Sequence, residues 1–176
     1  MQRKGLNFTS ADTTICENGT KNILKVLEEL ESDENVEKVG HQGPKMIFLS
    51  TTGISTQGRD IPLAMVPLYH WMLHVPHEDK RKMETVIQKS GRRWVVVRPS
   101  LLVDGESVGL KKVRTSTEGG EGERYGNGKD GEVAIGYTIR REDVGLWIFE
   151  ECVKGNGKGG GERWGKWEGK MVTLTY

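Results

Sequence analysis

Met46-Ile-Phe-Leu-Ser50, followed by Thr51-Thr-Gly53, is the stretch that decides the fold. Four apolar residues run without interruption and end in a cluster of hydroxyls. A strand that is buried on both faces has this pattern, as in a parallel sheet covered by helices. The stretch predicts a strand at about residues 45–50. The hydroxyls after it would then lie at the carboxyl ends of the strands, where open α/β sheets bind their ligands.

A second strand of the same kind follows further along the chain. Trp94-Val-Val-Val97 is again apolar without alternation, and Pro99 ends it. Between the two strands we expect a helix with Pro76 in its first turn, where a missing N–H costs little. That helix runs to about Ser90 and is capped by Gly91.

A helix is also predicted before the first strand. Thr14-Ile-Cys-Glu17 matches a capping box, and Ile23, Leu27 and Leu30 recur at helical spacing until about residue 32. Pro67 is expected to kink or divide any helix in the apolar stretch 62–74.

The carboxyl-terminal third alternates polar stretches with short elements. A short strand is predicted at 134–139 and a helix from Arg141 through Val153. Residues 171–176 alternate apolar residues with threonine, which predicts a closing edge strand. Residues 105–131 and 154–170 are mostly glycine and charge, so we expect flexible loops there.

Helices that alternate with buried strands predict an α/β fold with right-handed crossovers. We expect residues 1–176 to be a single, partial domain: the carboxyl-terminal part of a Rossmann-like parallel sheet with flanking helices, with the possibility that it is incomplete.

Composition excludes several classes of function. Basic and acidic residues nearly cancel, 26 against 25, so no net charge attracts nucleic acid or anionic lipid. No apolar run is long enough to cross a bilayer, and no signal peptide is recognised. Cys16 and Cys152 lie far apart, which favours buried thiols in a reducing, cytoplasmic location.

Several of these stretches together resemble a known family. The Ser-Thr-Thr after a strand, the Asp79-Lys…Met-Glu helix, the exit Arg98-Pro-Ser-Leu-Leu102 and Ile139-Arg-Arg-Glu-Asp-Val-Gly145 are similar to the atypical short-chain dehydrogenase/reductases. The NmrA-like branch with fungal members is the most similar. Each motif is weak alone, and their order and spacing carry the match.

The resemblance implies an NAD or NADP site. Lys80 matches the lysine that bonds the nicotinamide ribose, and Ser50 or Thr52 matches the hydroxyl residue beside the nicotinamide. Pro99, Ser100 and Leu101 match the loop whose backbone approaches the nicotinamide. The implied catalytic residues are Ser50, Thr52 and Lys80, and the implied cofactor-binding residues are Ser50, Thr51, Lys80, Pro99, Ser100 and Leu101.

Two departures from the family pattern stand out. The family's catalytic tyrosine would occupy the position of Pro76, which has no proton to give; Tyr69 and His77 are the possible substitutes. The family also begins with a strand, a glycine-rich phosphate loop and a helix, and no such unit is visible here. The later glycine-rich stretches do not replace it, because no buried strand precedes them and no apolar helix follows them.

The leading hypothesis is an NAD(P)-dependent oxidoreductase that acts on an unknown small molecule. The alternatives are a non-catalytic dinucleotide sensor or interaction protein, and a truncated form without independent activity. We expect the isolated chain to be poorly folded or to self-associate. His70, His74 and His77 are at helical spacing, but no carboxylate lies between the first two, so no metal site is predicted.

Overall fold

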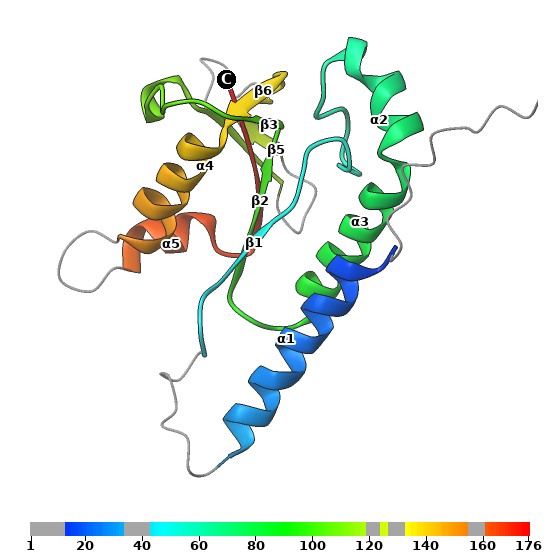
Figure 1. Ribbon diagram of the computed structural model, residues 1–176. Helices are drawn as coiled ribbons and strands as arrows, with labels where there is room; N and C mark the ends of the chain where they lie inside the picture. The colour runs from blue at the N-terminus through cyan, green and yellow to red at the C-terminus, as the bar shows by residue number, and fades with distance from the viewer. Residues whose placement is uncertain (1–12, 34–42, 119–123, 127–132, 155–160) are drawn as a thin grey trace, which may run out of the picture.

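The computed structural model describes residues 13–33, 43–118, 124–126, 133–154 and 161–176. The chain forms a five-stranded sheet with helices on both faces and a separate pair of strands (Figure 1). The elements follow one another as α1 (Ile15–Ser32), β1 (Met46–Leu49), the short 3-10 helix η1 (Leu63–Met65), α2 (Val66–Met72), α3 (His74–Lys89), β2 (Trp94–Pro99), β3 (Leu101–Val103), η2 (Leu110–Lys112), β4 (Arg114–Glu118), β5 (Arg124–Gly126), β6 (Thr138–Arg140), α4 (Arg141–Ile148), the π-helical turn η3 (Phe149–Val153), α5 (Gly161–Trp167) and β7 (Lys170–Thr175).

The large sheet has the order β1-β2-β7-β4-β5, in which the first three strands are parallel. Met46 lies opposite Trp94, and Val97 lies opposite Val172. β4 then pairs antiparallel with β7, and β5 pairs antiparallel with β4. The predicted partial Rossmann-like α/β fold is confirmed, and the antiparallel strands make its far edge mixed rather than wholly parallel.

The prediction that residues 171–176 form an edge strand is wrong. β7 lies in the middle of the sheet, between β2 and β4. Its alternation of apolar residues with threonine does not mark a solvent face, because Thr173 and Thr175 are buried. The Thr175 hydroxyl is satisfied instead by Ser100, at 2.9 Å.

The prediction of flexible loops at 105–131 and 154–170 is also wrong for much of both stretches. Residues 110–112 form η2, and residues 114–118 form β4, whose backbone pairs with β7. Backbone hydrogen bonds do not need apolar side chains, so the polar composition concealed this strand. In the second stretch, the buried side chains of Trp164 and Trp167 anchor α5. Residues 119–123, 127–132 and 155–160 lie outside the described part.

The core has two layers, one on each face of the sheet. Val95, Val97, Val172 and Leu174 pack on the side of α4 and α5. On the opposite face Met46, Val96 and Met171 pack with Met83 and Ile87 of α3, and Leu24 and Leu27 of α1 join them. Figure 1 shows α1 lying along α3 on this side and α4 and α5 on the other.

The first helix starts with a cap that the sequence pattern did not predict. Thr14 makes no side-chain cap, so the predicted capping box is wrong. The Asp79 carboxylate of α3 accepts the backbone N–H groups of Cys16 and Glu17 instead, at 2.8 and 2.9 Å. The helix ends at Ser32, as expected.

The remaining expectations concern prolines, cysteines and membrane spans. Pro67 lies in the first turn of α2, so it begins that helix. Both cysteines are free thiols; Cys152 is buried and Cys16 is half-buried. Among the described helices, none has the length and apolar character needed to cross a membrane.

Candidate functional site

The residues predicted to form a site meet at the carboxyl ends of β1 and β2. The backbone N–H of Ser50 donates to the carbonyl of Val97 at 2.7 Å, and that of Thr52 donates to the carbonyl of Pro99 at 3.1 Å. The hydroxyl loop after β1 therefore lies against the exit of β2. Parallel strands bring these two loops to one edge because their carboxyl ends point the same way.

Lys80 reaches this edge from α3. Its Nζ donates a hydrogen bond to the carbonyl oxygen of Leu49, the last residue of β1, at 2.7 Å. An ammonium has three donors and no acceptor, so it can bind other partners besides Leu49. The Cys16 thiol also lies close to it. The neighbour Lys82 is exposed.

Two buried hydroxyls at the same edge have no hydrogen-bond partner among the described residues. They are Ser50 Oγ and Thr52 Oγ1, on residues that are 6% and 1% exposed. A buried polar group without a partner costs about 1–3 kcal/mol. A polar ligand that bonded to both hydroxyls of this loop would remove that cost.

The other predicted residues differ in how available their side chains are. Ser100 is buried, and its hydroxyl is already bonded to that of Thr175. Leu101 is 48% exposed and begins β3, and Thr51 is half-buried. Pro99 is buried, and its carbonyl is bonded to Thr52. Any contribution of residues 99–101 to a ligand would come from the remaining backbone groups of that loop.

Neither proposed substitute for the family tyrosine has the pKa of an efficient proton donor at neutral pH. Burial raises the pKa of the Tyr69 phenol, and its contact with the Thr52 hydroxyl offsets only part of that rise. Burial lowers the pKa of His77 to about 4, helped by the positive charge of Arg81, so its imidazole is neutral at pH 7. Pro76 lies in α3 and is exposed.

Tyr69 and His77 nevertheless lie against the hydroxyl loop. Their ring centroids are 5.3 Å apart. Gly53 has φ +86°, and a side chain there would collide with both rings. The glycine therefore allows the loop to approach α2 and α3 closely. Three histidines, His70, His74 and His77, lie in this region, yet no group of metal-ligating side chains forms within the described residues.

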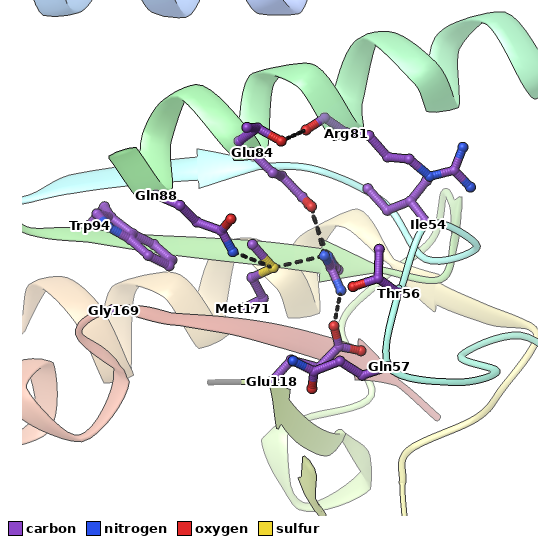
Figure 2. A pocket seen from close by; sticks show the side chains of 12 residues that line it. Ile54, Thr56, Gln57, Arg81, Glu84, Gln88, Trp94, Glu118, Gly169 and Met171 are labelled. Carbon is purple, nitrogen blue, oxygen red and sulfur yellow. Dashed lines mark hydrogen bonds and ion pairs between the residues drawn. The ribbon is translucent and has the colours of Figure 1, made fainter. Parts of the chain in front are cut away.

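A larger groove opens beside this edge, between α3, the sheet and the loop at 54–57. Its volume is about 480 Å³. Figure 2 shows Glu84 and Gln88 of α3 pointing toward Met171 and Glu118, with Arg81 beside Ile54 at one end of the groove and Trp94 at the other. That volume is in the range of small-molecule sites.

Most of the charge in this groove is internally balanced. Glu84 accepts two hydrogen bonds from Arg98, at 2.9 and 2.6 Å, and Glu118 accepts a third at 2.6 Å. Arg98 is 3% exposed, and its two carboxylates outweigh the cost of burial and raise its pKa. Arg98 therefore has a structural role, because it joins α3, β2 and β4 through buried ion pairs. Sequence reasoning missed the groove because its walls come from separate segments.

Sequence comparison finds two fungal relatives in curated proteins. The chain is 43% identical over 183 residues to "Reductase pytE" of Aspergillus terreus. That alignment covers 97% of this chain and 61% of the relative. It is 31% identical over 191 residues to "Oxidase pynE" of Aspergillus niger. That alignment covers 98% of this chain and 60% of the relative. The chain thus spans about 60% of the length of the curated relatives it matches. No family model matches it.

Structure comparison finds bacterial neighbours with the same fold. A short-chain dehydrogenase/reductase from Veillonella parvula, solved in complex with NADP, has a TM-score of 0.56 at 13% identity. That match covers 91% of this chain and 58% of the neighbour. A second neighbour, "Putative NAD-dependent epimerase/dehydratase from Bacillus halodurans", has a TM-score of 0.55 at 18% identity. That match covers 97% of this chain and 59% of the neighbour.

Proposed function

We propose that the carboxyl ends of β1 and β2 hold the nicotinamide end of NAD or NADP, and that the protein is an oxidoreductase. The premise is that this chain is a Rossmann-fold protein of the short-chain dehydrogenase/reductase type. The observation that carries the proposal is Lys80 Nζ bonded to Leu49 O, beside the partnerless hydroxyls of Ser50 and Thr52. The names of the two fungal relatives support an oxidoreductase, and the NADP of one structural neighbour supports the cofactor.

The residues present fit the nicotinamide ribose. The Lys80 ammonium has donor capacity beyond its bond to Leu49, and Ser50 and Thr52 offer buried hydroxyls that need partners. The backbone of residues 99–101 would bound the other side of the site. When bound, a reduced nicotinamide supplies hydride, and the role of this chain is to orient its ring toward a small-molecule acceptor above Ser50 and Thr52.

A second candidate, a non-catalytic dinucleotide sensor, is favoured by the proton-donor position. An efficient general acid needs a pKa near the working pH. Proline stands where the family has tyrosine, the pKa of Tyr69 is raised and that of His77 is about 4. If reduction does occur here, we expect its proton to come from solvent or from the substrate.

The ribose assignment is tested with reduced nicotinamide mononucleotide and with NADPH. The first ligand probes the nicotinamide site alone. We expect NADPH to bind little more tightly than the mononucleotide, because the sequence shows no glycine-rich loop for the pyrophosphate. Saturation-transfer NMR on the 176-residue chain detects weak binding of both.

Lys80→Ala should weaken binding of the mononucleotide about tenfold or more, since hydrogen bonds from a charged group are worth about 1.5–3 kcal/mol. Lys82→Ala removes the same charge two residues along the helix, at an exposed position, and should leave affinity unchanged. Equal losses in the two variants would contradict the role of Lys80. Sub-micromolar NADPH binding would show that another segment binds the phosphates.

A further inference from the structure

A small hollow opens between the hydroxyl loop and the helices α2 and α3. Its volume is about 30 Å³, and its lining includes Gly53, Tyr69, three histidines and Arg81. The histidines are His70 and His74, which are exposed, and His77, which is buried. The hollow shares Arg81 with the larger groove, but neither Lys80 nor Arg98 lines it.

The lining of this hollow is basic. A guanidinium and three imidazoles face it, and no carboxylate is among its lining residues. Two acidic groups contact residues of the lining: Asp60 accepts the N–H of Gly53 at 2.9 Å, and the exposed Glu78 lies 3.7 Å from Arg81. The guanidinium and the imidazole N–H groups can all donate hydrogen bonds to an anion.

A second observation points to a missing ligand. Nε2 of His77 is buried and has no hydrogen-bond partner among the described residues, and the whole residue is 5% exposed. A buried ring nitrogen without a partner is costly, and this one belongs to a residue that lines the hollow. A neutral imidazole can carry its proton on Nε2 and donate it to an oxygen.

Size selects the kind of anion. A water needs about 10–15 Å³ measured in this way, so the hollow has room for about two oxygens. A carboxylate presents two oxygens in a plane, which matches the flat fork of an arginine. A phosphate, with four oxygens, is too large to enter fully.

We propose that this histidine hollow binds a carboxylate. The hollow adjoins Gly53 and lies next to Thr52, so the bound group would be the acid group of the small-molecule substrate. That last step rests on the proposed function. Binding of the carboxylate itself does not.

The experiment titrates the 176-residue chain with sodium acetate at constant ionic strength, without any nucleotide. The histidine side-chain signals are followed by proton–carbon NMR. Acetate should move the signals of His70, His74 and His77 saturably, and chloride should not. Phosphate should bind at least about tenfold more weakly than acetate, because it does not fit.

Arg81→Gln should weaken acetate binding about tenfold, whereas Lys82→Gln, with the same charge change next to it, should not. His74→Gln, at an exposed position, should also weaken it and provides a second variant if Arg81→Gln folds poorly. Absence of saturable shifts, equal effects of the Arg81 and Lys82 changes, or stronger binding of phosphate or chloride would overturn the proposal. None of these outcomes bears on the Lys80 experiment, so the two ideas fail separately.

Discussion

Arg98 shows at the scale of one residue how a polar core is held together. Its guanidinium is enclosed by Glu84 and Glu118, and Met171 Sδ lies 2.8 Å from Nη2. A buried ion pair is weak evidence for stability, but removing one partner leaves the others buried without compensation. Here that would leave two carboxylates.

Arg98→Met should therefore lower the free energy of unfolding by about 3–5 kcal/mol. Arg93→Met is the matched control: Arg93 makes a bidentate pair with Glu168, but its side chain is 27% exposed. A partly exposed pair is worth about 0–1 kcal/mol. Urea unfolding followed by tryptophan fluorescence measures both, and similar losses would contradict the burial argument.

At the scale of an element, α1 depends on α3 for its start. Burial alone would raise the pKa of Asp79, but the N–H groups of Cys16 and Glu17, together with Lys80, hold it below its usual value. The carboxylate is thus kept charged at the helix N-terminus, where the dipole favours it.

Asp79→Ala should destabilise the chain by about 1–2 kcal/mol, the usual cost of losing a helix cap. Hydrogen exchange should rise first in the opening turn of α1 and much less in α3. The neighbouring change Glu78→Ala, at an exposed position, should cost less than about 0.5 kcal/mol. Uniform acceleration across both helices would argue against a capping role.

The capping box shows where prediction from sequence stops. Local patterns placed α1, β1, α3 and β2 nearly at their observed bounds, since periodicity and prolines act over a few residues. The true cap of α1 lies more than sixty residues away, and β4 is a strand because β7 lies beside it. Such long-range pairings leave no local pattern.

The candidate site divides along the same line. Lys80, Ser50 and Thr52 could be found from a strand, its loop and the next helix. The 480 Å³ groove and the histidine hollow could not, because each joins segments that only the folded chain brings together. The spacing of His70, His74 and His77 is the one local sign of the hollow among these features, and it does not indicate which ligand the histidines would face.

For the whole molecule, β1 is an edge strand of the described sheet. Ser50 and Met46 donate their N–H groups toward β2, so by alternation the N–H of Leu49 points away from it. The side chain of Leu49 is 45% exposed. An exposed apolar edge can pair with another chain. The apolar side chains of Leu24 and Leu27 are not open to another chain in the same way, because they pack against the core on the α3 side of the sheet.

We therefore expect the 176-residue chain to self-associate through β1. Leu49→Lys should lower the average mass measured by light scattering at high concentration, because a lysine on an edge strand opposes pairing. Leu63→Lys makes the same change at a leucine that is 72% exposed but lies outside the sheet, and should have no effect. A monomer for the unchanged chain at all concentrations would contradict this expectation.

The central place of β7 has a consequence for how the protein is made. β4 and β5 precede β7 in the chain, yet they reach the rest of the sheet only through it. During synthesis β4 and β5 leave the ribosome first, and neither can pair with the rest of the sheet until residues 170–175 emerge. Chains emerge from their amino end at about 5–20 residues per second, so these strands wait seconds for their neighbour. During that interval their unpaired backbones are open to chaperones and proteases. A stop codon before Lys170 would leave both strands without a partner in the sheet.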